Sequence, residues 1–220
     1  MITTKALTRL ARAGDPDAQF RLGYRLAFGR RRKRSWTEVV RWWKAAAAQR
    51  HRRALFFLGT CCDFGTGTRR DIRRAMALYA AAARLGHATA QYNLGFGYRD
   101  GEGVARRPQR AVRWFKKAAH QGEVAAQRDL GYCLHEGFGV RRNYAEAVKW
   151  YRRAASRGDA KAQFNLALCY RDGDGVPQNP RRARLWLKRA ARRGHRRARE
   201  LLRSLPPNPV GADRRATSSS

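Results

Sequence analysis

The chain repeats a pattern of residues every 36 positions, and this period limits its fold more than any other feature. In five units a leucine follows the recurring alanine after four residues, and a small residue comes next. Further along each unit lie a tryptophan or leucine and then a pair of alanines. The recurring alanines are Ala18, Ala54, Ala90, Ala126, Ala162 and Ala198. A fixed period of this length predicts a solenoid, because one such unit buries its apolar face only by stacking on its neighbours.

Each unit has the pattern of two amphipathic helices. In the third unit, Ala90, Leu94 and Tyr98 share one face of the first helix. The second helix reads "PQRAVRWFKKAAHQG", with apolar residues at helical spacing and Gly122 at the expected C-terminal cap. We therefore expect an all-α chain of stacked helix-turn-helix units.

The third, fourth and fifth units carry a specific resemblance. "AQYNLGFGYRDGEGVARRPQRAVRWFKKAAHQG" is similar to the Sel-one-like repeat (SLR), a relative of the tetratricopeptide repeat, and the next two units match it equally well. This resemblance implies a right-handed α-solenoid that serves as an adaptor or scaffold for protein partners, usually in bacteria. We expect five repeats with partial helical caps at both ends.

The period divides the whole chain into segments. The first repeat is atypical, since "FGRRRKRSW" replaces the double-glycine turn and Arg50 replaces the closing glycine. The expected segments are an N-terminal capping helix within 1–17, repeats at 18–53, 54–89, 90–125, 126–161 and 162–197, a C-terminal capping helix at 198–205 and a disordered tail at 206–220.

A glycine-rich turn, "RDGEGV" from Arg99 to Val104, invites comparison with phosphate-binding loops. It follows a helix rather than a strand, and it recurs as "HEGFGV" and "RDGDGV" in the next two repeats. We interpret it as the turn between paired helices, with Gly101 ending the first helix and Val104 folding back onto the apolar seam. No cofactor is expected, and no catalytic set of residues departs from the period, so a non-enzymatic protein is predicted.

The net charge of +33, from 49 Lys and Arg against 16 Asp and Glu, favours anionic partners. The densest cationic positions lie in the first inter-helix turn and near the end of the chain. Candidate polyanion-binding residues are Arg30, Arg31, Arg32, Lys33, Arg34, Arg181, Arg182, Lys188, Arg189, Arg192, Arg193, Arg196 and Arg197. Attachment to nucleic acid or to an anionic membrane surface is the alternative function.

The leading functional hypothesis places a protein or peptide segment in the concave groove. By the resemblance, the first helix of each repeat lines that groove, and Asn93 and Asn165 match an asparagine that related solenoids use to hold a peptide backbone. Interleaved aromatic rings there offer apolar anchoring sites. The candidate groove residues are Phe56, Tyr92, Asn93, Phe96, Arg99, Tyr132, Asn165 and Arg171. A packing role for the aromatic rings between repeats is the competing interpretation.

The four cysteines have neither disulfide nor zinc spacing. Cys61, Cys133 and Cys169 occupy one repeat position, and equivalent positions in stacked helix pairs lie about 10 Å apart, too far for a disulfide. We expect buried free thiols, no metal and no small-molecule substrate. No apolar run reaches the length of a transmembrane segment and no secretory signal is visible, so a cytoplasmic location is expected, with signal-less secretion left open.

Overall fold

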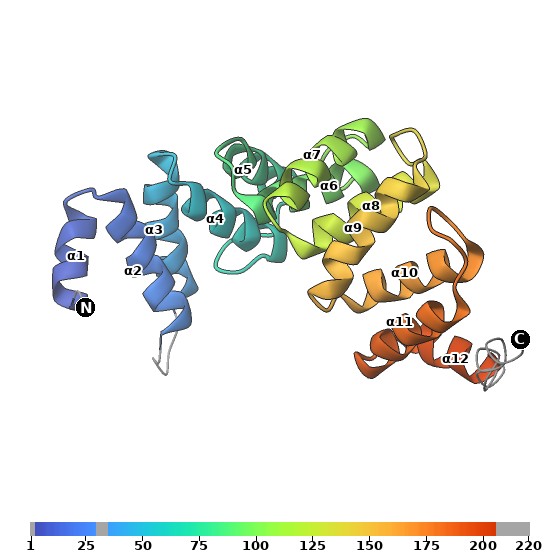
Figure 1. Cartoon of the computed structure of the whole chain (residues 1–220). Coiled ribbons are helices and arrows are strands. Elements are labelled where there is room, and N and C mark those ends of the chain that lie inside the picture. Colours follow the sequence, from blue (N-terminus) through green and yellow to red (C-terminus); the bar gives the residue numbers. More distant parts are fainter. Residues whose placement is uncertain (1–2, 30–34, 206–220) are drawn as a thin grey trace, which may run out of the picture.

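The computed structural model describes residues 3–29 and 35–205, and these form twelve α-helices (Figure 1). Each helix packs against the next one along the chain. The helices are α1 (Thr4–Arg12), α2 (Pro16–Phe28), α3 (Trp36–Ala48), α4 (Arg52–Phe64), α5 (Ile72–Arg84), α6 (Ala88–Asp100), α7 (Pro108–His120), α8 (Val124–Glu136), α9 (Tyr144–Ser156), α10 (Ala160–Asp172), α11 (Pro180–Arg192) and α12 (Arg196–Ser204).

The helices stack in sequence as an α-solenoid, which confirms the predicted fold class. Helices α2 to α11 form five antiparallel pairs, and each helix packs chiefly against the helices before and after it. The shorter helices α1 and α12 cover the two ends. Figure 1 shows the stack bent into an arc, with the N-terminal pairs on the left and the C-terminal pairs at the lower right.

The double-glycine turn behaves as the sequence predicts. Gly101 ends α6 in the left-handed region, with φ 82°, where an L side chain is strained. Gly103 has φ 67°, and a Cβ there would lie 2.7 Å from the backbone oxygen of Ile72 in the preceding repeat. Val104 packs against the core. The turn therefore both ends a helix and touches the neighbouring repeat.

A glycine in four of the first helices lets an aromatic ring of the paired helix approach the backbone. A Cβ on Gly95 would lie 2.7 Å from the fully buried ring of Phe115, and one on Gly131 would lie 2.8 Å from Tyr151. The fifth repeat has Ala167 at this position, and there the partner is the smaller Leu187. Glycine thus lies opposite an aromatic ring, and alanine lies opposite the smaller leucine side chain.

Buried glutamines join consecutive repeats. The amide nitrogen of Gln91 donates to the carbonyl of Ala83, at the end of the preceding helix, at 3.1 Å. Gln19, Gln127 and Gln163 make the equivalent bonds. In the terminal cap the Arg199 guanidinium takes the same role toward Ala191, at 3.3 Å. These bonds satisfy carbonyls at helix C-termini, which have no partner within their own helix.

The observed helix bounds fall close to the expected segments. The first helix of each repeat begins two residues before the recurring alanine, so this alanine lies in the first turn of the helix. The N-terminal cap is α1 and the C-terminal cap is α12, which starts at Arg196 rather than at position 198. The predicted disordered tail, 206–220, and the basic run 30–34 lie outside the described residues.

Candidate functional site

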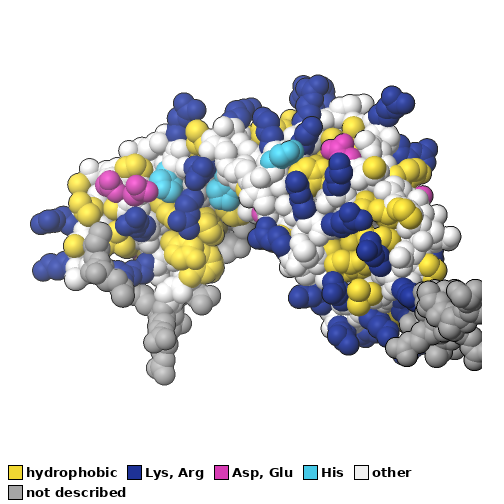
Figure 2. All heavy atoms as spheres, viewed as in Figure 1, with side chains coloured by type: hydrophobic (Ala, Val, Ile, Leu, Met, Phe, Trp, Pro, Cys, Tyr) yellow, Lys and Arg dark blue, Asp and Glu magenta, His cyan; other side chains and the backbone are white. Residues whose placement is uncertain are grey.

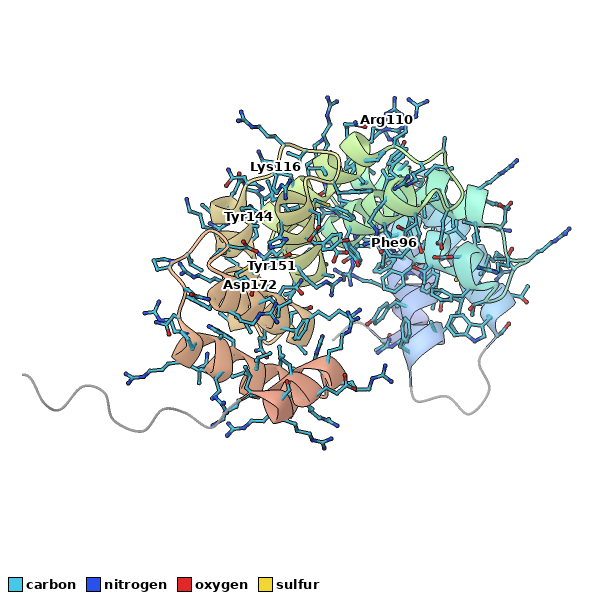
Figure 3. The ribbon with its side chains drawn as sticks, turned by 90° about the vertical axis from the view of Figure 1, so that its right-hand side faces the viewer. Phe96, Arg110, Lys116, Tyr144, Tyr151 and Asp172 are labelled. Carbon is cyan, nitrogen blue, oxygen red and sulfur yellow. The ribbon has the colours of Figure 1, made fainter. Side chains whose placement is uncertain are left out.

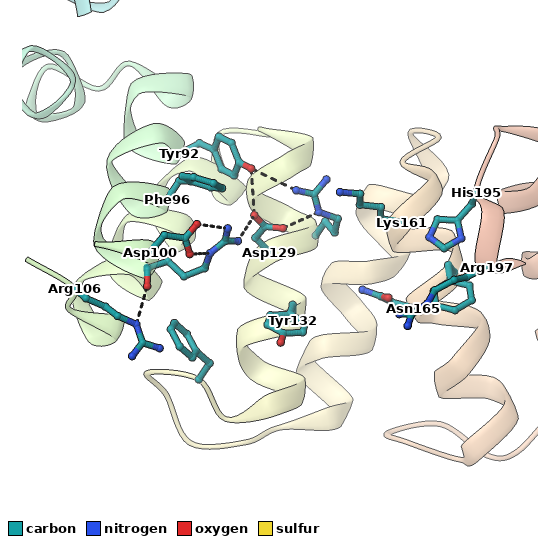
Figure 4. Close-up of a pocket in the computed structure, with 14 residues that line it drawn as sticks. Tyr92, Phe96, Asp100, Arg106, Asp129, Tyr132, Lys161, Asn165, His195 and Arg197 are labelled. Carbon is teal, nitrogen blue, oxygen red and sulfur yellow. Dashed lines mark hydrogen bonds and ion pairs between the residues drawn. The ribbon is translucent and has the colours of Figure 1, made fainter. Parts of the chain in front are cut away.

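The concave side of repeats three to five holds a hollow of about 860 Å³ (Figure 4). The first helices α6, α8 and α10 form its wall, and the turn after α6, the turn after α8 and the start of α12 contribute its edges. Its lining consists of Tyr92, Phe96, Arg99, Asp100, Arg106, Arg128, Asp129, Tyr132, Phe138, Lys161, Phe164, Asn165, His195 and Arg197. Aromatic rings, cations and one carboxamide thus face a single open cavity.

Asp129 is the buried centre of this wall, with only 7% of its surface exposed. Its carboxylate accepts hydrogen bonds from Arg128 Nε at 2.7 Å and from Arg99 Nη1 at 3.3 Å. The Tyr92 hydroxyl also donates to it, at 3.2 Å. A buried carboxylate needs such partners to offset its lost hydration. Asp129, labelled in Figure 4, therefore links Arg99 to Arg128.

Two further carboxylates fix the outer ends of the same arginines. Asp100 accepts two bonds from Arg99, at 2.7 and 2.8 Å, and these bonds hold the pKa of Asp100 below its usual value. Asp159 accepts from Arg128 Nη1 at 3.1 Å. Burial lowers the pKa of Arg128, but the hydrogen bond and charge of Asp129 outweigh it and the pKa is raised. Both guanidiniums therefore stay charged at any physiological pH.

The structure brings five of the eight predicted groove residues into the hollow. Tyr92, Phe96, Arg99, Tyr132 and Asn165 line it, and Tyr132 is 47% exposed. Phe56, Asn93 and Arg171 do not line it. Phe56 stacks on His87 between repeats, and Arg171 forms an exposed ion pair with Asp172 at 2.6 Å.

The two asparagines lie near tyrosines inside the solenoid. Burial raises the pKa of Tyr79 to about 12 and also raises that of Tyr151, whereas Asn93 and Asn165, each close to one of these phenols, act in the opposite direction. Both tyrosines belong to the second helix of the preceding repeat. Each pair lies 14 residues apart, so the Tyr–Asn match is visible in the sequence once the repeats are aligned.

Sequence reasoning missed several residues of the hollow. Arg106 and Phe138 belong to inter-helix turns, and their cation–π contact, 5.4 Å from guanidinium carbon to ring centre, joins the turns of two repeats. Lys161 and His195 sit at the start of α10 and just before α12. No local pattern marks these positions, because the curvature of the stack decides which turns reach the concave side.

Three histidines at equivalent positions between repeats have a structural role. The imidazole Nδ1 of His87 accepts the Ala90 N–H at 3.3 Å and so caps α6, while the ring stacks on Phe56. His51 and His195 cap α4 and α12 in the same way. All three rings are half-buried, because each fills the joint between one repeat and the next.

The cations of the second helices face outward, as Arg110 and Lys116 of α7 do in Figure 3, whereas Phe96 lies on the inner side. Several of them cover tryptophans at one repeat position: Lys117 lies 4.6 Å from the Trp114 ring centre, and Arg153 and Arg189 lie 4.5 Å from those of Trp150 and Trp186. Such cation–π contacts give part of the basic surface a packing role.

The residues predicted to bind a polyanion do not form one surface in the structure. Arg30, Arg31, Arg32, Lys33 and Arg34 lie outside the described residues. Of the C-terminal set, Arg182 contacts the Tyr170 hydroxyl at 3.3 Å, Arg196 pairs with Glu200 at 3.5 Å, and Arg197 faces the hollow. Arg181, Lys188, Arg192 and Arg193 lie with Arg189 on the exposed surface of α11 and at its end.

The four cysteines are free and buried, as expected. Burial raises the pKa of Cys61 to about 11 and those of Cys133 and Cys169 to about 12. Within residues 3–29 and 35–205, no group of three or more histidine, cysteine or acidic side chains is placed to hold a metal ion. None of the helices in this same part of the chain has the length and apolar character needed to cross a bilayer.

Stacked helix pairs of equal length around a lined concave wall define an α-solenoid repeat protein. More narrowly, the chain belongs to the Sel1 repeat family: the Sel1 repeat matches residues 16–51, 52–87, 88–123, 124–159 and 160–195. These ranges begin two residues before the segments drawn from the alanine period. A comparison with curated proteins finds no match.

Solved structures of this fold resemble the chain closely. A Sel1 repeat protein from Oxalobacter formigenes is 31% identical, with a TM-score of 0.81, over 90% of this chain and 80% of that one. The protective antigen c5321 of uropathogenic Escherichia coli, which displays an SLR fold, is 28% identical with a TM-score of 0.67, over 92% and 51% of the two chains. A Sel1 repeat protein from Klebsiella pneumoniae, 21% identical with a TM-score of 0.54, shares the fold over 92% and 98%.

Proposed function

We propose that the chain is a non-enzymatic adaptor that binds a segment of a protein partner in the hollow of repeats three to five. Sel1 repeats generally mediate protein interactions, and this family membership supplies the class of function. The observation that carries the proposal is the hollow itself, where partly exposed rings lie beside arginines already fixed by carboxylates.

The chemistry of the wall suits a protein segment. Arg128 also donates from Nη2 to the Tyr92 hydroxyl, at 3.4 Å. Arg99 and Arg128 each have five N–H donors, and each uses three of them in contacts within the wall. The remaining donors, with the Asn165 carboxamide, can bond to backbone carbonyls or acidic side chains. Tyr132 and Phe96 offer apolar surface beside them. Held side chains lose little freedom on binding, which favours affinity.

A peptide-display selection tests this function. A library of random 12-residue peptides is selected on the full chain, and the selected peptides are measured by calorimetry against Tyr132→Ala and Lys149→Ala. Tyr132 lies in the hollow, whereas Lys149 is an exposed residue of α9. We expect the first substitution alone to weaken binding. Selection of no peptide, or equal binding by both variants, would contradict the proposal.

A second candidate function is attachment to a polyanion through the outer surface. The observation in its favour is that α7 and α11 carry cations along their length and no acidic residue. Sequence-independent binding of this kind weakens steeply with salt, because bound counterions are released. Gel shifts with duplex DNA, RNA and anionic vesicles across a salt series test it, and lack of binding at low salt to all three rules it out.

The compartment is part of the same proposal. Four buried free thiols suit a reducing environment, so we place the adaptor in the cytoplasm. Fractionation of cells that express the tagged full chain tests this location, and recovery from the culture medium would overturn it.

A further inference from the structure

The hollow has more positive charge than its own carboxylates balance. Its lining includes five cations, Arg99, Arg106, Arg128, Lys161 and Arg197, against two carboxylates, Asp100 and Asp129. The excess is local to the concave wall and is separate from the cations of the second helices. A surface of this sign selects an acidic partner and speeds its approach.

Lys161 and Arg197 are the cations left over. Both are exposed, and neither makes an ion pair with another described residue. Their charges both lower the pKa of His195, after the larger effect of burial, so both side chains lie near that imidazole. Figure 4 shows Lys161, Asn165, His195 and Arg197 together on the α10–α12 side of the hollow. Two unpaired cations beside a neutral ring and a carboxamide form a site for a carboxylate.

The same face of the solenoid carries a group of aromatic rings in repeats one and two, with Arg21 and Arg53 beside them at the positions of Asp129 and Lys161. Position for position, Phe28 corresponds to Asp100, and Phe57 corresponds to Asp129. Tyr24, which corresponds to Phe96, packs edge-on against Phe57 with ring centres 5.7 Å apart. Phe28 is 52% exposed and Tyr24 is 41% exposed. Figure 2 shows hydrophobic side chains gathered beneath this N-terminal half, between the α2–α3 pair and α4.

Exposed rings grouped in this way are typical of a surface that a partner covers. Because the repeat positions are equivalent, the aromatic patch and the cationic hollow belong to one continuous concave face. The spacing of neighbouring first helices is about 10 Å, so the five first helices from α2 to α10 span roughly 40 Å, the length of about 12 extended residues.

We infer that the concave face binds an extended acidic protein segment that carries bulky apolar side chains at one end. The acidic end lies over Lys161 and Arg197, and the apolar end lies over Tyr24, Phe28 and Phe57. This inference rests on the proposed function and adds the chemistry of the partner. A nucleic acid fits the face less well, because the carboxylates of Asp100 and Asp129 would face its phosphate backbone.

Fluorescence anisotropy with the full chain tests the inference. The probe is a labelled 12-residue peptide with six glutamates in one half and phenylalanines alternating with serines in the other, made in both orders. Two matched probes replace every glutamate by lysine or every phenylalanine by serine. A labelled duplex DNA is the fourth probe. We expect the glutamate–phenylalanine probe to bind, in one order better than in the other, and the lysine probe not to bind.

Variants assign the binding to the concave face. Lys161→Ala with Arg197→Ala should weaken binding of the acidic probe about tenfold or more, which is a loss of about 1.4 kcal/mol or more in charge contacts. Lys116→Ala with Lys149→Ala removes the same charge from exposed positions of α7 and α9 and should change affinity less than twofold. Phe28→Ser should weaken the glutamate–phenylalanine probe and leave the serine-matched probe unchanged.

Each other outcome overturns the inference. Equal losses in the two charge variants would show binding to net charge alone. Tighter binding of DNA that depends on Lys161 and Arg197 would assign the face to a nucleic acid. If the display selection returns peptides that depend on Tyr132 but are not acidic, the adaptor function stands and this inference falls.

Discussion

The imidazole of His87 lies flat on the ring of Phe56, with ring centres 4.3 Å apart and planes inclined by 16°. The same ring caps α6, so a single side chain starts one helix and seals it to the preceding repeat. Phe164 and His195 repeat the arrangement at 4.4 Å and 21°. In both pairs the phenylalanine and the histidine are 31 residues apart in the sequence.

The fourth repeat uses an ion pair in place of this stack. Arg128 and Asp159 occupy the equivalent positions, joined at 3.1 Å, and Asp159 caps α10. We therefore predict that Phe56→Arg and His87→Asp each lower the free energy of unfolding. The double variant should lose about 1 kcal/mol less than the sum of the two single losses. Urea unfolding of the four proteins measures this coupling, and strictly additive changes would contradict it.

The histidine caps should make the fold sensitive to acid. Burial and the charges of Arg52 and Arg53 lower the pKa of His87 from 6.5 to about 4. The neutral ring leaves Nδ1 free to accept the Ala90 N–H. The unfolded chain takes up a proton at this residue first, so the stabilising effect is complete above pH 6.5 and is lost as the pH falls toward 4. Thermal unfolding followed by circular dichroism should show the melting temperature falling over this range.

A matched variant isolates the effect of His87. Asparagine at this position keeps a capping oxygen but does not titrate. His87→Asn should therefore lower the melting temperature at pH 7.5, through loss of the stack, and show a flatter decline between pH 6.5 and 4. An unchanged slope would assign the acid sensitivity to other groups.

The backbone of Arg50 is strained, and a glycine at this position should relieve the strain. Arg50 has φ 59°, in the left-handed region, where the four later repeats have glycine. Arg50→Gly should raise the free energy of unfolding by about 1 kcal/mol. The reverse change, Gly86→Ala, should cost a similar amount for backbone reasons alone, since a Cβ there meets nothing closer than 3.7 Å. Denaturant midpoints of both variants measure this, and a destabilised Arg50→Gly would contradict the argument.

The small residue of each first helix should be coupled to the ring it faces. Gly95→Ala places a Cβ against Phe115 and should cost about 1–3 kcal/mol. The fifth repeat tolerates Ala167 opposite Leu187, so Gly95→Ala should cost less in a Phe115→Leu background. A double-mutant cycle in urea measures the difference, and an equal cost in both backgrounds would disprove the coupling.

The buried thiols should be unreactive in the folded protein. Burial raises the pKa of Cys133 and Cys169 to about 12, which leaves almost no thiolate at pH 8. A thiol reagent should therefore label none of the four cysteines rapidly in the native state and all four in guanidinium chloride. Rapid native labelling would show that the helix pairs open more readily than their packing implies.

Much of the architecture is readable from the sequence because it is periodic. The alanine positions and the helix pairs recur in all five repeats, and the double-glycine turn and the closing glycine recur in the last four. One physical explanation therefore applies to most of the chain. The residues of the hollow are harder to predict from the sequence, because they depend on side-chain contacts between repeats. Asn93 looks like a peptide-binding residue until it is set beside Tyr79, 14 residues earlier. Phe138 enters the hollow through the bend of the stack, which the period does not encode.

The sequential stacking of the helices also has a mechanical consequence. Since each helix packs chiefly on its immediate neighbours, the two ends of the described part, residues 3–29 and 35–205, are joined chiefly through the repeats between them. Under tension, the solenoid should behave as a spring that yields one repeat at a time from its ends. Each 36-residue repeat that yields would lengthen the chain by about 120 Å. A partner that lies along the whole concave face would contact several repeats at once, and it would therefore raise the force needed to separate them.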